Sequence, residues 1–269
     1  MRRASPALLL LAALVLGAGC REDKPVEPLS ALAPAPLGPL ATAQPDAGGD
    51  DDAVFRVAPA AVFGEEVPGE ALRLELAGEA LRLGAESFTS RKPEEASRLA
   101  ERVKGQRVLV VPDADTFLAQ TSEALEVLRD SAAEVWLKHP DAAVAYRLVL
   151  RDEEGFRAWL AEVAPGKLRI IQRSDGFELS TSVGKLPGGD PNGPSVPVRG
   201  GKQDIATLRK GLGLLKGRFK TAEDLCLVPS FGTEVAQAAR ALSGVYTEPG
   251  EPLFETLCLV YPTPARAKR

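Results

Sequence analysis

The chain has 269 residues, a net charge of −4 at neutral pH and 45% hydrophobic residues. This length suits one large domain or two small ones, with enough apolar residues for a substantial core. The slightly acidic balance, with basic residues spread along the chain, argues against a nucleic-acid partner.

The first twenty residues, MRRASPALLLLAALVLGAGC, have the pattern of a secretory signal peptide at residues 1–19. Their apolar stretch is too short for a stable membrane-spanning helix, and no later run is long enough. Small residues before Cys20 resemble the lipobox of bacterial lipoproteins, although Gly17 stands where that family prefers leucine. The resemblance implies that Cys20 is acylated and holds an exported protein on a membrane in the periplasm or cell envelope. Plain secretion with a free Cys20 is the alternative.

Residues 20–53 are predicted to form a disordered tether. Six prolines lie among alanine, glycine and leucine, and the segment has no periodic apolar face. A basic tail at 263–269 is expected to be solvated, including Arg266–Arg269. The folded part between them is predicted to comprise a first unit at 54–142, a connecting strand and helix at 143–166, and a second unit at 167–262.

In the first unit, alternation of apolar and polar residues predicts a hairpin over 71–85, turning at Ala77-Gly78. Pro93 favours the start of a helix, because proline suits the first helical turn and the two glutamates after it suit the helix dipole. Apolar spacing predicts the remaining elements: a strand at 107–111, a helix between Leu118 and Leu128, and a strand at 133–137.

The second unit repeats this order after a connecting strand and helix at 144–163. A hairpin is expected over 168–183 with Asp175-Gly176 as its turn, and Asp204 is expected to cap the next helix. The remaining elements are a strand at 225–229, a helix between Val235 and Val245, and a strand at 256–262. The sequence therefore predicts an α+β fold of two tandem β-β-α-β-α-β units.

Two strand-to-helix segments carry the repeat, VVPDADTFLAQTSEAL at 110–125 and LVPSFGTEVAQAARAL at 227–242. At a constant offset of 117 residues, seven of fifteen positions are identical, among them Thr116 with Thr233 and Gln120 with Gln237. Internal similarity of this kind indicates a tandem duplication.

Cys226 and Cys258 lie in two similar segments, LCLVPS and LCLVYP. If these strands are neighbours in matching register, the thiols are within reach of a disulfide, which an exported compartment permits. The alternative is that both cysteines act as small buried hydrophobes.

Few residues suggest catalysis. The single histidine, His139, stands where the second unit has Tyr261, which favours a position at the rim over a catalytic role. One histidine without a clustered cysteine pair also argues against a zinc site, and no cofactor is expected. Asp113 and Asp115 follow a strand and precede a helix, where carboxylates cap the helix or bind a ligand.

The segment GKLPGGDPNGPSVPVRGG at 184–201 is a long connection rich in glycine and proline. Loops of this length are typically functional or disordered. Its polar side chains Asp190, Asn192 and Arg199 are candidates for binding a ligand or partner, with Arg199 suited to an anion or carboxylate. A structural lid or a flexible excursion is the alternative.

The block VLVVPDADTFLAQTSEALEVLRDSAAEVWL at 108–137 resembles the periplasmic domain of the ExbD/TolR family, and LRIIQRSDGFEL at 168–179 is similar to the hairpin that opens that domain. In the family, an N-terminal membrane helix with an essential aspartate works with proton-channel subunits. This sequence shows no such helix, so the resemblance implies the periplasmic role alone: domain pairing and contact with envelope partners.

These observations predict a non-enzymatic envelope lipoprotein that binds or scaffolds partners in biopolymer transport or envelope energisation. The expected partners are the membrane, through acylated Cys20, and proton-channel or TonB-like proteins or peptidoglycan. The alternative is a lipoprotein that binds a solute or cell-wall ligand in a cleft between the units, using the glycine- and proline-rich loop. An enzyme is the third and least favoured reading.

Overall fold

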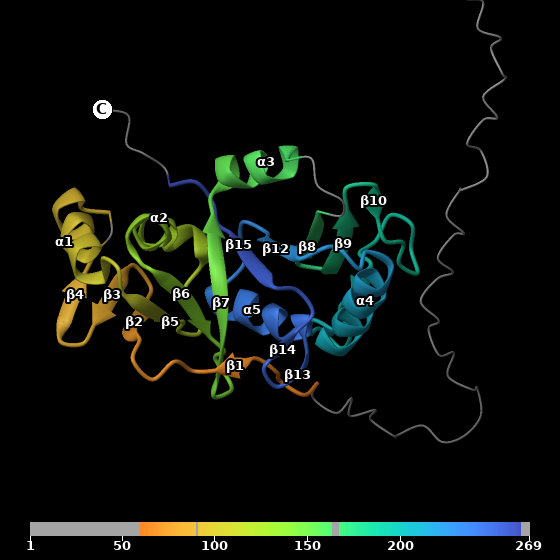
Figure 1. The fold of residues 1–269 in the computed structure, drawn as a ribbon, viewed down its shortest axis with the longest axis horizontal. Helices are drawn as coiled ribbons and strands as arrows, with labels where there is room; N and C mark the ends of the chain where they lie inside the picture. Colours follow the sequence, from red (N-terminus) through yellow and green to blue (C-terminus); the bar gives the residue numbers. More distant parts are fainter. Residues whose placement is uncertain (1–59, 90, 163–166, 265–269) are drawn as a thin grey trace, which may run out of the picture. The chain divides into compact units, whose positions relative to one another are not determined.

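A mixed β-sheet of thirteen strands and five α-helices form the main elements of residues 60–89, 91–162 and 167–264, which the computed structural model describes. The predicted α+β class is confirmed (Figure 1). The predicted signal peptide, Cys20, the linker up to residue 53 and Arg266–Arg269 lie outside the described residues. Within those described ranges, no helix has both the length and the apolar character needed to cross a membrane.

The first half of the sheet follows the predicted order, with one additional short strand after the hairpin. Its elements are β2 (Leu72–Ala77), β3 (Ala80–Leu83), β4 (Glu86–Phe88), α1 (Pro93–Val103), β5 (Arg107–Val111), a short 3-10 helix (Leu118–Gln120), α2 (Ser122–Ser131) and β6 (Glu134–Lys138). The β2–β3 turn is Gly78–Glu79, one residue later than predicted, because Ala77 is the last residue of β2. Gly78 has a positive φ of 62°, a conformation that glycine adopts without steric penalty. Pro93 occupies the first turn of α1, with Glu94 and Glu95 beside it, as predicted.

The second half repeats the order with additional short strands. Its elements are β8 (Leu168–Arg173), β9 (Gly176–Thr181), β10 (Gly184–Lys185), β11 (Val196–Pro197), α4 (Ile205–Arg218), β12 (Asp224–Pro229), α5 (Val235–Leu242), a 3-10 helix (Ser243–Val245), β13 (Tyr246–Glu248), β14 (Glu251–Pro252) and β15 (Thr256–Val260). Asp204 caps α4 by accepting a hydrogen bond from Thr207 N at 2.9 Å, as predicted. The predicted hairpin turn is wrong by one residue, because the turn is Ser174–Asp175 and Gly176 is the first residue of β9.

A central strand, β7 (Val144–Arg151), joins the two halves into one sheet. The strand order in the first half is β3-β2-β5-β6, and in the second half it is β9-β8-β12-β15. β7 lies between β6, to which it is antiparallel, and β15, to which it is parallel. Corresponding strands therefore occupy corresponding places on the two sides of β7.

Helices α1, α2, α4 and α5 pack against one face of the sheet and enclose a continuous hydrophobic core. The opposite face is covered over β12 and β15 by α3 (Glu153–Ala161), whose Trp159 contacts Cys226 and Cys258 in a separate apolar cluster. Asp152 caps α3 by accepting a hydrogen bond from Gly155 N at 2.7 Å. The two sheet faces thus have different partners: four helices on one side and a single helix on the other.

The described chain begins at residue 60 and runs across both halves before it enters β2. A two-residue strand, β1 (Glu65–Glu66), pairs with the start of β7. Tyr146 donates a hydrogen bond to Phe63 O at 3.2 Å, and Tyr246 donates one to Glu65 at 2.9 Å. This segment is therefore fastened to the central strand and to the second half.

Candidate functional site

The two repeated strand-to-helix segments meet each other at the centre of the molecule. Leu118 N donates to Thr233 O at 3.1 Å, and Val235 N donates to Thr116 O at 2.9 Å. Between these two bonds, Phe117 and Glu234 form an isolated antiparallel bridge. Leu118 and Val235 occupy equivalent positions in the two repeated segments, as do Thr116 and Thr233, so the two hydrogen bonds are equivalent. The contact therefore has the reciprocity of a two-fold symmetric interface. We refer to residues 113–120 and 230–237 as the junction.

The same symmetry extends to the side chains that cap the two helical segments. Gln120 accepts a hydrogen bond from Phe117 N at 3.0 Å, and Gln237 accepts one from Glu234 N at 3.3 Å. Thr116 and Thr233 are both buried beneath the bridge. The residues that recur in the sequence are thus those that build the two sides of the junction.

The junction explains why the first of its helices begins later than predicted. Leu118 starts a single 3-10 turn, and α2 begins only at Ser122. The Leu118 N–H group, which a helix start leaves without an internal partner, is satisfied by Thr233 O from the other half.

Asp113, predicted to cap a helix or bind a ligand, connects the junction to the β2–β3 turn. Its carboxylate accepts hydrogen bonds from Thr116 N at 2.8 Å and from Gly78 N at 3.2 Å, in the β2–β3 turn. Asp115 is exposed. The structure therefore gives Asp113 a positioning role and leaves the side chain of Asp115 at the surface.

Two exposed aromatic side chains belong to the junction, and sequence reasoning did not identify either of them. Phe231 is 80% exposed and Phe117 is 39% exposed. Their counterparts at the offset of 117 are Ala114 and Glu234, so neither aromatic ring is repeated. The junction is symmetric in its backbone and asymmetric in its surface. The sequence did contain a signal for these two residues: each is an aromatic residue at a position where the two repeated segments differ.

Replacing either glutamine cap by alanine is expected to lower the free energy of unfolding by a similar amount, about 1 kcal/mol, because each change removes the acceptor of one backbone N–H group. Urea unfolding of Gln120→Ala and Gln237→Ala measures both values. Gln106→Ala is the control, since Gln106 is exposed and lies outside the junction. A loss confined to one of the two caps would contradict the equivalence of the two sides.

The loop at 184–201 is folded against β9, and its candidate binding residues are engaged in local contacts. Asp190 accepts a hydrogen bond from Asn192 N at 2.9 Å, and Arg199 forms an ion pair with Asp204 at 3.1 Å. Buried Ser195 accepts from Leu179 N at 3.1 Å and donates to Leu186 O. These contacts hold the loop in one conformation against β9.

The structure does not bring the predicted site residues together. Asp113 follows β5, whereas the loop lies beside β9 and β10 at one end of the sheet. Seven strand spacings separate β5 from β10, roughly 30 Å at the usual distance between neighbouring strands. Among the described residues, no hydrogen bond or ion pair joins Asp113 or Asp115 to Asp190, Asn192 or Arg199.

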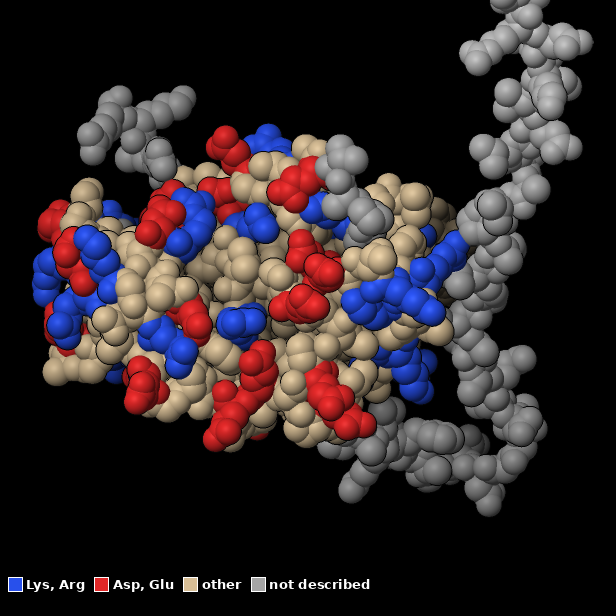
Figure 2. Space-filling model, in the orientation of Figure 1, with Lys and Arg blue, Asp and Glu red and all other residues tan. Residues whose placement is uncertain are grey.

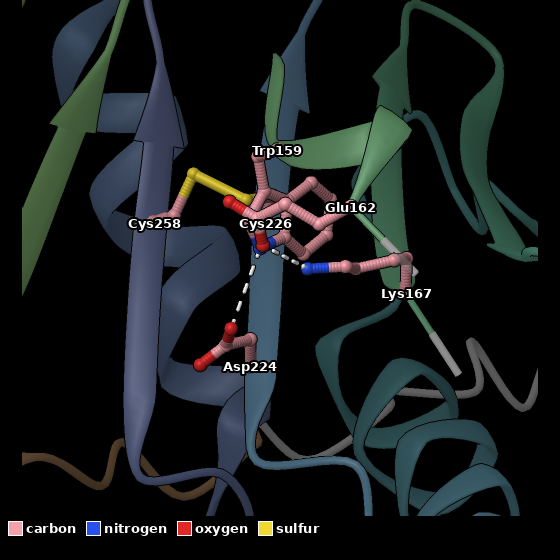
Figure 3. The surroundings of a disulfide bond; sticks show 6 residues. All are labelled: Trp159, Glu162, Lys167, Asp224, Cys226 and Cys258. Carbon is pink, nitrogen blue, oxygen red and sulfur yellow. Dashed lines mark hydrogen bonds and ion pairs between the residues drawn. A yellow bond between two sulfur atoms is a disulfide. The ribbon is translucent and has the colours of Figure 1, made fainter. Parts of the chain in front are cut away.

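Cys226 and Cys258 are directly opposite each other on parallel neighbours β12 and β15, with their Cα atoms 4.4 Å apart, and they form a disulfide (Figure 3). Trp159 of α3 covers the disulfide and is itself 1% exposed. The indole N–H donates to Asp224 at 3.3 Å, which orients the ring over β12. The disulfide is therefore enclosed between the sheet and α3.

Basic side chains surround the ring of Trp159. Lys167 Nζ lies 4.6 Å from the ring centroid, and the guanidinium carbon of Arg151 lies 6.0 Å from it. Lys167 also forms an ion pair with Glu162 at 2.7 Å, at the end of α3 (Figure 3). Cation–π contacts of this kind add to the apolar packing that holds α3 in place.

His139 is buried, so the prediction of a position at the rim is wrong. It follows β6, as Tyr261 follows β15, and both residues face the interior. The Nδ1 atom of His139 accepts a hydrogen bond from Asp141 N at 3.1 Å. Burial lowers the pKa of His139 below its ordinary value, and the charges of Arg240 and Lys138 also lower it, whereas Asp141 raises it.

This lowered pKa predicts a loss of stability in mild acid. As the pH falls through the ordinary histidine pKa of 6.5, the unfolded chain binds a proton that the folded chain does not yet bind, so the free energy of unfolding decreases. His139→Asn keeps an acceptor and removes the titration. Urea unfolding between pH 7 and about 5 is expected to show the decline in the wild-type chain and a flatter profile in the variant. Parallel profiles would contradict the assignment, because the chain has a single histidine.

A surface depression of about 330 Å³ lies over α1 and β4, lined by Glu86, Ser97, Arg98, Glu101 and Arg102. It belongs to one half alone and is open to solvent, unlike the cleft expected between the units. Across the described residues, no group of three or more histidine, cysteine or carboxylate side chains is arranged to hold a metal ion.

Comparison with known proteins identifies no relative: no family model, curated protein or solved structure matches the chain.

Proposed function

We propose that the chain is an exported lipoprotein, anchored through Cys20, whose two ExbD/TolR-like units together form one non-enzymatic binding or scaffolding module of the cell envelope. In this proposal the module serves biopolymer transport or envelope energisation. Its partners are membrane proteins of the proton-channel or TonB-like kind, or peptidoglycan.

The observation that supports this proposal is the reciprocal contact at the junction. In a two-fold symmetric dimer the same surface of both subunits meets itself, and here Thr116–Leu118 and Thr233–Val235 of one chain meet in that way. A tandem duplication therefore accounts for both the repeat and the contact. One chain supplies what two subunits supply in a homodimer.

Duplication also allows the two sides of the junction to diverge. In a dimer of identical subunits, every exposed side chain of the junction would occur twice. Here the exposed Phe117 and Phe231 each occur once, because their counterparts are Glu234 and Ala114. Aromatic side chains are enriched at protein interfaces, because they bury a large apolar area with few rotatable bonds. The proposal therefore assigns Phe117 and Phe231 to the contact with a protein partner, bound in a single orientation.

Site-specific photo-crosslinking in cells tests this assignment. A photoreactive amino acid is placed at Phe231 or Phe117 of the full chain, and the adducts are identified by mass spectrometry. Val183 is the matched control, because it is an apolar residue with 83% exposure in the β9–β10 turn, outside the junction. Adducts with envelope proteins at the junction positions, and not at Val183, are the expected result.

Adducts of equal yield at Val183 and at the junction would overturn the assignment, as would their absence at both junction positions.

The anchor is tested separately by metabolic labelling with a fatty acid, which Cys20→Ser is expected to abolish. The duplication is tested by the mass in solution of the chain from residue 20 onward, which is expected to be that of a monomer. A stable dimer would contradict the idea that one chain supplies both halves.

A further inference from the structure

Helix α4 and the residues after it carry a concentration of positive charge in a chain that is acidic overall. Residues 205–222 contain no aspartate or glutamate. They contain five basic residues: Arg209, Lys210, Lys216, Arg218 and Lys220. Blue side chains gather over the part of the surface that holds α4 (Figures 1 and 2).

The outward face of α4 is basic and has an apolar centre. Lys210, Leu214 and Arg218 are exposed and follow one another at intervals of four residues, so they lie along one side of the helix. Leu214 is 56% exposed between the two basic residues. We refer to Lys210, Leu214 and Arg218, with the neighbouring Lys220, as the α4 face.

The charges of the α4 face are not neutralised by acidic neighbours. Within the described part of the chain, Lys210, Arg218 and Lys220 form no ion pair. On α1, the corresponding helix of the first half, Arg98 and Arg102 both pair with Glu86. The basic residues of α1 are therefore paired with an acid, whereas Lys210 and Arg218 of α4 are not paired with any described residue.

The N-terminal end of the described chain lies against the same helix. Arg209 donates a hydrogen bond to Ala61 O at 2.7 Å, and its guanidinium carbon lies 4.5 Å from the ring centroid of Phe63. The chain that leads from Cys20 therefore enters the folded part beside α4.

We propose that the α4 face docks on the surface of an anionic phospholipid bilayer. Basic side chains near such a surface are attracted by its negative potential, and an apolar side chain among them can enter the interface between headgroups and acyl chains. Leu214 favours a bilayer over an anionic polymer such as peptidoglycan, since a hydrated polymer offers no apolar phase. The inference adds to the proposed anchor a second membrane contact that orients the module.

Vesicle binding tests this inference without the anchor. The chain from residue 20 onward, carrying Cys20→Ser, lacks both the apolar leader and any acyl chain and keeps every described residue. Its sedimentation is compared with vesicles of phosphatidylglycerol mixed with phosphatidylcholine and with vesicles of phosphatidylcholine alone. Binding to the anionic vesicles only, weakening as salt increases, is the expected result.

Two double variants distinguish the α4 face from the charge of the whole protein. Lys210→Gln with Arg218→Gln is expected to weaken binding about 25-fold, since each basic residue contributes roughly fivefold. Arg82→Gln with Lys104→Gln is the control, because both residues are exposed, form no ion pair among the described residues and lie in the first half. This control is expected to bind like the parent.

Equal weakening in the two double variants would overturn the proposal, as would the absence of binding to anionic vesicles at low salt. Binding to purified peptidoglycan in place of vesicles would also overturn it and assign the α4 face to the cell wall. None of these outcomes bears on acylation of Cys20, which the labelling experiment tests by itself.

Discussion

Replacing Trp159 with alanine is expected to lower the free energy of unfolding by about 3–5 kcal/mol, because a fully buried tryptophan leaves a large cavity. The change is also expected to expose the disulfide to reductant while the four-helix side of the sheet stays folded. Trp159 is the buried α3 side chain in the cluster with Cys226 and Cys258, and the main core lies on the other face. Denaturant unfolding measures the first effect, and the rate at which thiols appear under native conditions measures the second.

Trp136→Ala is the matched control for this variant. Trp136 is the other of the chain's two tryptophans, and it is buried on the same sheet face in a separate cluster. Its indole N–H also donates to a carboxylate, that of Glu134. Its loss is expected to destabilise the protein and to leave the disulfide covered. Similar rates of thiol release in the two variants would show that α3 does not protect the disulfide.

The cysteine pair illustrates what local patterns in the sequence could predict. The similar segments around Cys226 and Cys258 suggested two strands in matching register, and the structure places the two residues opposite each other. The start of α1 at Pro93 and the cap at Asp204 were also predicted, and the β2–β3 hairpin was predicted with its turn one residue too early. Each depends on neighbours in the sequence, so its physical cause lies within a few residues.

The junction could not be predicted in the same way, because its contacts join residues 115 to 119 positions apart. The repeated Thr116, Gln120, Thr233 and Gln237 indicated a duplication, but no local pattern indicates that the two copies bond to each other. The same long-range contact replaced the predicted start of a helix at Leu118 with a 3-10 turn. Burial of His139 likewise depends on packing of the whole sheet, including the ring of Tyr146.

The loop at 184–201 was the least predictable candidate. Its composition is compatible with a flexible binding loop, and what determines its conformation is a contact of β11 with β9, where Val196 pairs with Phe177. Gly176 permits this contact. Its φ is 143°, and a Cβ atom at this position would lie 2.1 Å from Val196 O and 2.9 Å from the Cα of Pro197. The sequence-based assignment of Gly176 to a turn missed this role in packing.

Gly176→Ala is accordingly expected to lower the free energy of unfolding by roughly 3–5 kcal/mol, combining backbone strain at a positive φ with displacement of β11. Gly184→Ala separates the two causes. Gly184 has a φ of 140°, but a Cβ atom there would meet nothing within 4 Å, so strain alone is expected, about 1–3 kcal/mol. Denaturant unfolding of both variants gives the difference between the two losses in free energy of unfolding, which measures how strongly the contact of β11 with β9 holds the loop.

Equal losses in the two variants would mean that β11 is displaced at little energetic cost. Asp190, Asn192 and Arg199 would then belong to a loop free to open, and a ligand-binding role for it would regain support.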